Sequence, residues 1–488
     1  MIRTSPALLT DLYELTMGYG YWKEGMSDDE AIFHLSFRNQ PFGGGYTVAC
    51  GLQDVMDYLE QFRFDQSDLE YLESLTGADG QSLFSPDFLE YLSRLEFACD
   101  VEAVPEGTVV FPHEPLLQVK GPLVQAQLFE TALLNIINFQ TLIATKAARV
   151  CVAAKGAPVL EFGLRRAQGP DGALAASRAA YIGGCSATSN VLAGKVFQIP
   201  VRGTHAHSWV MSFADELASF EAFAVSMPGN CVLLVDTYNS LQGVRHAIEV
   251  GRSLRKRGKD LLAIRLDSGD LAYLSVAARR MLDESGFQTT RILASNDLDE
   301  YIISSLHEQG ARIDIWAVGT KLVTAYDQPA LGGVYKLSAT RKKDGPWQYK
   351  VKLSEQVAKV STPGRLQVRR FSSRGTYTAD LIFDQLRGVE PSRTMVDPAD
   401  VTIRRRIPKE AEYRDLLVPI FQAGRRVYQS PSIHEMQAIA HDELDKLYAG
   451  VKRLLNPHLY PVGLEAGLHE LKTQLVTDLR ASEVIDLQ

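Results

Sequence analysis

The chain has few cysteines and no long apolar run. Its five cysteines lie far apart and form no Cys-x-x-Cys pair, which excludes the spacing typical of a disulfide framework or a structural zinc site. The first residues lack the apolar core of a signal peptide, and no stretch of about 18 uninterrupted apolar residues occurs. These absences predict a reduced, cytoplasmic protein with no membrane partner.

Positive charge is also scarce. The formal net charge is −8, and the basic clusters at 252–257 and 404–406 are short. Short clusters of this kind are typical of solvated faces, so we expect no nucleic-acid partner. The chain does have length and apolar content: 488 residues that are 45% hydrophobic suffice for about three domains of ~150 residues.

The middle of the chain alternates short β-branched runs with amphipathic segments. Two segments, 241–257 and 271–285, have helical periodicity, and Asp270 can cap the second while Gly286 can end it. Six strands are expected to begin near Val159, Val201, Val232, Leu262, Ile292 and Ile313. This alternation is typical of βα units around a parallel sheet, and predicts an irregular α/β barrel or a doubly wound sheet.

The flanking segments have a different sequence pattern. Helices are expected at 11–23 and 53–62, and a strand at 108–111. Segments 348–353 and 366–371 alternate polar with apolar residues, which predicts antiparallel strands that complete the flanking sheet. The predicted organisation is the N-terminal part of a discontinuous α+β domain (1–124), an α/β barrel catalytic domain (125–340), returning antiparallel strands (341–400) and a mainly helical C-terminal region (401–488).

Polar residues gather where the expected strands end. His205 and His207 follow the apolar run 199–201, which looks like the end of a buried strand. Strand ends in α/β proteins are where loops present side chains to ligands. Charged residues also follow four other expected strands, in segments 161–166, 235–239, 265–270 and 294–297. We therefore expect one pocket that draws on all of these strand ends.

Two of the strand ends have the character of a phosphosugar site. Asp267 and Asp270 bracket a glycine that permits close backbone approach, as ribose hydroxyls or Mg²⁺ require. The alternative is an ordinary turn that caps the next helix. Gly319 and Thr320 close the sixth expected strand, where backbone N–H groups can hold a phosphate or simply form a turn.

A third strand end suits a flat, anionic ligand. Phe162 is followed closely by Arg165 and Arg166. An aromatic ring can stack on the ligand while a guanidinium gives its carboxylate a bidentate partner. The alternative is that both arginines form structural salt bridges.

Six segments together resemble the nicotinate phosphoribosyltransferase family. They are 10–14, 37–44, 161–167, 203–208, 236–238 and 265–270. The resemblance runs to about Gly364 and continues more weakly beyond it. It implies an ATP-dependent, ligase-type enzyme of NAD biosynthesis that forms nicotinate mononucleotide and pyrophosphate from nicotinate and 5-phosphoribosyl 1-pyrophosphate. Mg²⁺ is then expected to bind mainly through the substrate phosphates, with no firm protein ligand set.

The resemblance also implies roles for single residues. His207 becomes a phosphohistidine by accepting a phosphoryl group from ATP, whereas His205 occupies a position where the family tolerates other residues. Tyr13 reaches into the site of the partner subunit, so a homodimer with shared active sites is expected. The substrates are paired with residues as follows: the nicotinate ring with Phe162 and Arg165, the ribose with Arg265 and Asp267, and the 5′-phosphate with Gly319 and Thr320. Asn190, Ser208, Ser268 and Asn296 are further expected substrate contacts.

The chemistry of the reaction fits these residue types. Displacing pyrophosphate from C1 of the ribose builds positive charge on the sugar and negative charge on the leaving group, so positioning and electrostatics outweigh any protein nucleophile. The neutral imidazole of His207 can accept a phosphoryl group near neutral pH, and we infer that Asp236 orients its other N–H. The expected catalytic residues are His207, Asp236 and Asp267.

Three alternatives remain open. His205 and His207 also resemble the His-x-His metal pair of barrel hydrolases, but the only later histidines of the barrel, His246 and His307, lie inside helical patterns. A barrel that senses a metabolite without catalysis is the second alternative. Nicotinamide phosphoribosyltransferase is the third, and Asn190 favours nicotinate because an acid there would repel a carboxylate.

Overall fold

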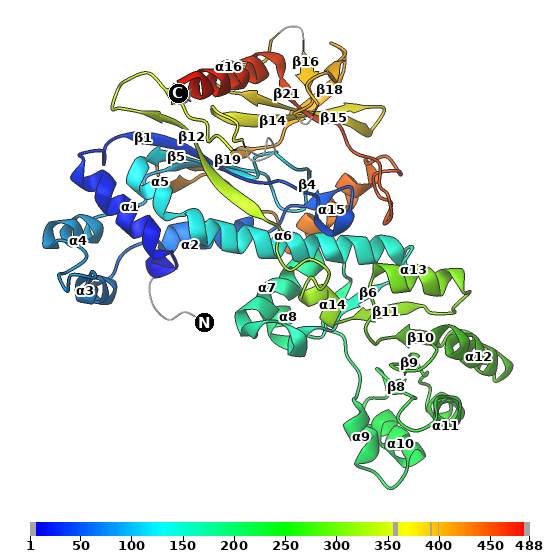
Figure 1. Cartoon of the computed structure of the whole chain (residues 1–488). Helices are drawn as coiled ribbons and strands as arrows, with labels where there is room; N and C mark the ends of the chain where they lie inside the picture. Colours follow the sequence, from blue (N-terminus) through cyan, green and yellow to red (C-terminus); the bar gives the residue numbers. More distant parts are fainter. Residues whose placement is uncertain (1–5, 355–359, 391–392, 399, 483–488) are drawn as a thin grey trace, which may run out of the picture. The chain divides into compact units, whose positions relative to one another are not determined.

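The computed structural model describes residues 6–354, 360–390, 393–398 and 400–482. The chain divides into two compact units, Met1–Leu142 with Ala330–Gln488 and Ile143–Pro329 (Figure 1). The second unit is thus inserted within the sequence of the first, and helix α6 (Glu130–Ala153) crosses the boundary at residue 142. Within the described residues, no helix has the length and apolar content needed to cross a membrane.

A seven-stranded sheet with antiparallel pairings is the centre of the first unit. Its order is β13-β12-β1-β5-β3-β19-β20. β1 (Glu30–Phe37) pairs on one side with β12 (Gly333–Arg341) and on the other with β5 (Leu117–Pro122). Six of its eight residues are buried, as expected of a strand covered on both faces. The other strands are β3 (Asp100–Ala103), β13 (Gln348–Tyr349), β19 (Val418–Gln422) and β20 (Arg425–Arg426).

The predicted helices and strand of the N-terminal part are confirmed. Helices α1 (Leu12–Lys23) and α2 (Leu52–Gln61) match the expected segments, and β4 (Val109–Val110) pairs with β2 (Thr47–Val48). A capping box between Asp65 and Asp68 begins α3, because the two side chains satisfy each other's free backbone N–H groups. The remaining helices of the unit are α3 (Gln66–Ser74), α4 (Pro86–Ser93), α5 (Leu123–Leu128), α15 (Ile433–Asp445) and α16 (Ala466–Ser482).

A second, six-stranded sheet of this unit corrects two predictions. β14 (Leu366–Ser373) is a strand, as expected, but it pairs with β15 (Thr376–Asp384) and not with the central sheet, whereas β13 does join the central sheet through β12. Alternation predicts a strand but not its partner. The region expected to be mainly helical also begins with strands, and its first helix starts only at Ile433. The strands before this helix are β17 (Arg404–Arg406), β18 (Glu412–Asp415), β19 and β20. The second sheet also contains β16 (Thr394–Val396) and β21 (Val462–Glu465).

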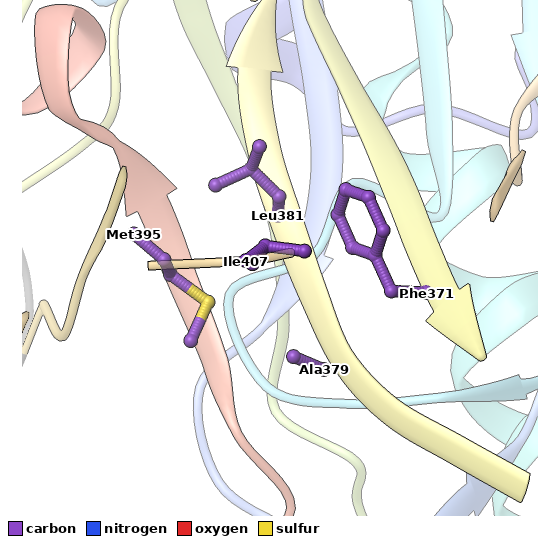
Figure 2. Close-up of a cluster of buried hydrophobic side chains, with 5 residues drawn as sticks. All are labelled: Phe371, Ala379, Leu381, Met395 and Ile407. Atoms are coloured by element: carbon purple, nitrogen blue, oxygen red, sulfur yellow. The ribbon is translucent and has the colours of Figure 1, made fainter. Parts of the chain in front are cut away.

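One face of this sheet carries a compact apolar core. Five buried side chains form it: Phe371, Ala379, Leu381, Met395 and Ile407 (Figure 2). They come from β14, β15, β16 and the residue after β17. Strands from three separate stretches of sequence are therefore held together by burial of one apolar cluster.

The second unit is built on six parallel strands, which confirms the predicted α/β class. The order is β7-β6-β11-β10-β9-β8, and each neighbouring pair is parallel. The strands are β6 (Val159–Glu161), β7 (Ala187–Thr188), β8 (Val232–Leu234), β9 (Ala263–Leu266), β10 (Arg291–Ala294) and β11 (Ile315–Val318). Leu160, Ala187, Leu293 and Ala317 form a buried cluster between them, which positions the strand ends.

The strand expected near Val201 is the one prediction that fails here. Val201 forms only an isolated bridge to Thr188, and the sheet instead uses the short strand β7. The helices α11 (Ser240–Lys256) and α12 (Leu271–Glu284) are confirmed, and Asp270 caps α12 by accepting from the Tyr273 N–H at 3.0 Å. The other helices are α7 (Gly169–Ile182), α8 (Val191–Phe197), α9 (His207–Met211), α10 (Glu216–Ser226), α13 (Glu300–Glu308) and α14 (Thr320–Val323).

Candidate active site

A cavity of about 480 Å³ lies where the parallel strands of the second unit end. Loops after β6, β9, β10 and β11 line it, together with segment 203–207. Eight of the predicted site residues line this cavity: Phe162, Arg165, His207, Arg265, Asp267, Asn296, Gly319 and Thr320. The expectation that several strand ends serve one pocket is therefore confirmed for these residues.

His207 is the first residue of α9, and its side chain is 42% exposed. Its Nδ1 lies 3.1 Å from the Thr237 hydroxyl, and its Nε2 lies 3.7 Å from Asp267 Oδ2. One ring nitrogen is thus oriented by a hydroxyl while the other faces a carboxylate. The inferred pairing of His207 with Asp236 is wrong, because Thr237, the next residue along the chain, occupies that place.

Asp236 instead holds the loop that follows β9. Its Oδ2 accepts from the Asp267 backbone N–H at 2.8 Å and from the Ser268 hydroxyl at 2.6 Å. Its Oδ1 is buried and has no hydrogen-bond partner among the described residues. Neither Asp236 nor Ser268 lines the cavity. Both residues therefore act on the position of Asp267.

Asp267 and Arg265 form an ion pair at the cavity wall. Arg265 donates to Asp267 Oδ1 at 2.8 Å and, through Nε, to the Ser295 hydroxyl at 2.8 Å, while that hydroxyl donates to the same Asp267 oxygen. Burial alone would raise the pKa of Asp267, but the Ser295 hydrogen bond and the charge of Arg265 together lower it. Asp267 is therefore an anion whose Oδ2 is turned toward His207. Ser295 was not among the predicted site residues, although it stands in an expected strand-end segment.

The Arg265 guanidinium also lies over the Phe162 ring, 5.7 Å from its centroid. Arg165 follows in a short 3₁₀ helix, Leu164–Arg166, whose side chains point to the cavity from the same loop. Gly319, the residue before α14, lies beside this loop, and a Cβ there would be 3.1 Å from the Phe162 carbonyl oxygen. A side chain at this position would therefore press on the Phe162 carbonyl where these two strand-end loops meet.

His205 lines the cavity but is a buried residue, 8% exposed. Its Nε2 accepts from the Leu234 backbone N–H at 3.2 Å, and its ring packs against Phe220 and Phe223. Burial lowers the pKa of His205 to about 4, so the ring is neutral at physiological pH. The nitrogen that a phosphoryl group would need is already used by the backbone.

Two further predicted substrate contacts, Asn190 and Ser208, do not line the cavity, and Tyr13 is expected at the site of a partner subunit. Asn190 is 2% exposed and caps α8 by accepting from the Ala193 N–H at 3.2 Å. Ser208 is an exposed residue of α9 that does not line the cavity. Tyr13 belongs to α1 of the first unit and is 45% exposed. Burial, with the nearby Glu130 carboxylate, raises the pKa of Tyr13 to about 12.

The acidic groups of the cavity are few. Asp267 and Asp297 line it, and no group of three or more His, Cys, Asp or Glu residues among the described residues could enclose a metal ion. Mg²⁺ commonly takes one or two protein carboxylates and completes its shell with water and substrate phosphates. The donor set of this cavity fits that manner of binding.

Comparisons with known proteins point to one family. Family models described as the nicotinate phosphoribosyltransferase N-terminal domain and C-terminal domain match residues 8–138 and 365–472. Among curated relatives, nicotinate phosphoribosyltransferase of Bacillus subtilis is 45% identical, over 97% of this chain and 98% of the relative. The enzyme of the same name from Caenorhabditis elegans is 35% identical, over 95% and 92% of the two chains.

A solved structure is similar over the same extent. The crystal structure of human nicotinic acid phosphoribosyltransferase superimposes with a TM-score of 0.82 at 31% identity, covering 96% of this chain and 99% of the human one. Family models at both ends of the sequence and relatives of near full length leave no large segment unmatched. The chain therefore belongs to the nicotinate phosphoribosyltransferase family and is an enzyme of NAD biosynthesis of that type.

Proposed function

We propose that the strand-end cavity is where this enzyme joins nicotinate to the ribose of 5-phosphoribosyl 1-pyrophosphate. One observation carries the proposal: a single cavity is lined by Phe162 and Arg165, by the Arg265–Asp267 pair and by Gly319. These groups match the three parts of the reactants, which are a flat carboxylate, a ribose and a phosphate.

In the reaction, the C1–oxygen bond to pyrophosphate breaks and a bond from the pyridine nitrogen to C1 forms. The ribose gains positive charge as the leaving group departs. The Asp267 anion is placed to stabilise that charge, and the Arg265 and Arg165 cations offset the charges of the phosphates and the nicotinate carboxylate. Mg²⁺, when bound through the substrate phosphates, neutralises charge on the departing pyrophosphate. Orientation of the two reactants provides the remaining part of the rate enhancement.

We further propose that ATP phosphorylates His207 and that hydrolysis of the phosphohistidine is coupled to synthesis. The partial exposure of His207 and its hydrogen bond to Thr237 support this role, since an oriented, accessible imidazole is a competent nucleophile. His205 lacks such access because its ring is buried. The product is ADP, and water later releases the phosphoryl group as inorganic phosphate.

We also propose a homodimer in which Tyr13 completes the site of the partner subunit, in the cytoplasm. The half-exposed aromatic ring of Tyr13 on α1 supports the first part, and five free thiols support the second. Mixing a Tyr13→Ala protein with an Arg165→Ala protein would restore one intact site per hybrid dimer. Hybrid dimers without activity would exclude the arrangement.

The decisive assay incubates the enzyme with 5-phosphoribosyl 1-pyrophosphate, Mg²⁺ and each pyridine base, with and without ATP. We expect nicotinate mononucleotide, formed faster with ATP. His207→Ala should abolish ATP hydrolysis and the ATP effect while leaving slow synthesis, and His205→Ala is the matched control that should keep the coupling. Preferential turnover of nicotinamide would favour the nicotinamide enzyme, and tight stoichiometric zinc would favour a hydrolase.

A further inference from the structure

The loop that carries Phe162 and Arg165 is anchored by a buried carboxylate. Glu161 is the last residue of β6, is 1% exposed and does not line the cavity. Its Oε1 accepts from the Gly163 backbone N–H. Its Oε2 accepts from the hydroxyls of Ser177 at 2.9 Å and Thr188 at 2.6 Å. A buried carboxylate with three donors is a specific construction, because each unpaired oxygen would otherwise carry a desolvation cost.

The partners of Glu161 come from separate elements of the second unit. Ser177 lies on α7, and Thr188 ends β7. Asn190 extends the network, since its backbone N–H donates to the Thr188 hydroxyl at 2.9 Å and its side-chain amide to the Ser177 hydroxyl at 3.2 Å. Ser189, between Thr188 and Asn190, lines the cavity. Two segments of cavity wall, 162–166 and Ser189, are thus tied to one carboxylate.

Close packing and a backbone hydrogen bond also restrict the loop after Glu161. A Cβ on Gly163 would lie 2.3 Å from Val323 Cγ1 and 3.0 Å from Glu161 Oε1. The Phe162 N–H donates to the Val318 carbonyl at 2.8 Å. The backbone on both sides of Phe162 is therefore fixed, on one side by β11 and on the other by Glu161.

We propose that Glu161 is a positioning residue for the pyridine base. By holding the Gly163 amide and the Thr188 hydroxyl, it keeps Phe162, Arg165 and Ser189 in the arrangement that receives nicotinate. The inference rests on the proposed function of the cavity and deepens it. It also gives Asn190 a role in base recognition through this buried network, without contact with the ring.

The network needs a carboxylate, and an amide of the same shape is not equivalent. If Gln replaced Glu161, one of its two terminal groups would be an NH₂ donor. Turned toward Gly163, that group would oppose another N–H donor. Turned toward Thr188, it would leave the Thr188 hydroxyl proton without its acceptor, because that proton is donated to the Glu161 oxygen that the NH₂ group would replace. In either orientation of the amide one hydrogen bond is lost, and one of the two segments of cavity wall is expected to shift.

The test compares Glu161→Gln with the unmodified enzyme in steady-state kinetics. We expect KM for nicotinate to rise about tenfold, since small misplacements at a reacting centre have effects of this size or larger. KM for 5-phosphoribosyl 1-pyrophosphate should stay within about twofold, because Gly319 and Thr320 are held by β11 and α14. Titration calorimetry with nicotinate should show the same weakening.

Asp314→Asn is a control at an exposed carboxylate that does not line the cavity. Asp314 precedes β11 at the opposite end of the sheet, and its carboxylate accepts from the Ile292 backbone N–H at 2.8 Å. It should lower the melting temperature without separating the two KM values. Ser177→Ala gives a milder disturbance of the same network and should raise KM for nicotinate alone.

The outcomes separate this proposal from the function beneath it. If the unmodified enzyme forms no nicotinate mononucleotide, the proposed function fails. If it does, and Glu161→Gln and Ser177→Ala change both KM values alike or change neither, then Glu161 is a structural residue only. A loss specific to nicotinate in both variants supports positioning.

Discussion

At the scale of single residues, close packing decides which substitutions the cavity wall accepts. The φ angle of Gly163 is −99°, which any residue can adopt, so the requirement for glycine is steric. A Cβ there would lie 2.3 Å and 2.6 Å from the two methyl groups of Val323, which is 1% exposed. A buried, β-branched neighbour cannot turn away easily.

We therefore predict that Gly163→Ala lowers kcat/KM for nicotinate at least about tenfold and destabilises the fold by about 1–3 kcal/mol, as overpacking does. Val323→Ala in the same chain makes room for the new methyl group. Kinetics and thermal melting of both variants test this. Equal losses with and without Val323→Ala would show that the contact with Val323 is not the cause.

His205 gives a pH prediction at the same scale. Burial lowers its pKa to about 4, from 6.5 for the ordinary group. Between these pH values the unfolded chain binds a proton at His205 that the folded chain does not, so stability falls as the pH falls from about 6.5 to 4. His205→Gln should reduce this fall in melting temperature. Parallel pH profiles of the two proteins would rule out His205 as a contributor.

At the scale of secondary structure elements, two aspartates close in sequence have different roles, one structural and one chemical. Asp270 caps α12, whereas Asp267 lines the cavity. Asp270→Ala should cost about 1 kcal/mol of stability, the usual loss at a helix N-cap, and leave kcat nearly unchanged. Asp267→Asn should lower kcat by about two orders of magnitude or more. Thermal melts and product assays distinguish them, and a large activity loss in Asp270→Ala would contradict the division.

The elements predicted from sequence were those with local signals. The helices α11 and α12 and the cap at Asp270 follow from periodicity and capping, which depend on neighbours along the chain. The short strand β7 was missed and Val201 was misassigned, because two-residue strands have no period to detect. The partner of β14 depends on contacts with residues far away in sequence.

The same limit applies to the candidate site. Strand ends marked the eight residues that line the cavity, since parallel strands bring their carboxyl ends to one edge. The hydrogen bonds of Asp236 and Asn190, however, go to Ser268 and Ser177 from other elements. The residue types and sequence positions of Asp236 and Asn190 do not indicate these partners. The sequence therefore predicts contacts for both residues that the structure does not show.

At the scale of the whole molecule, each unit contains a buried cluster of charges. In the second unit, the Glu300 carboxylate pairs with Lys146 at 2.7 Å and with Arg149 at 2.8 Å. In the first unit, Arg370 is 1% exposed and pairs with Asp380 and with Glu443, the latter at 3.0 Å. Such clusters cost little when complete and much when one partner is removed.

Arg370→Met is therefore predicted to destabilise the first unit by about 3–5 kcal/mol, because the buried Asp380 loses its arginine and Glu443 keeps only Arg414. The loss should shrink at low pH, where protonation removes the uncompensated negative charge. Scanning calorimetry at several pH values tests this. A loss that does not depend on pH would point to packing of the arginine stem and not to charge.

The pairing of β1 with β12 limits the order in which the growing polypeptide can fold. β1 ends at Phe37, but its neighbour β12 begins only at Gly333. During synthesis, roughly three hundred residues must leave the ribosome before this edge of β1 finds its partner. The inserted unit, whose contacts lie within one continuous stretch, can fold in the meantime. Until β12 is synthesised, the edge of β1 that pairs with it stays without a partner strand. Chaperones that shield such edges would matter most at that stage.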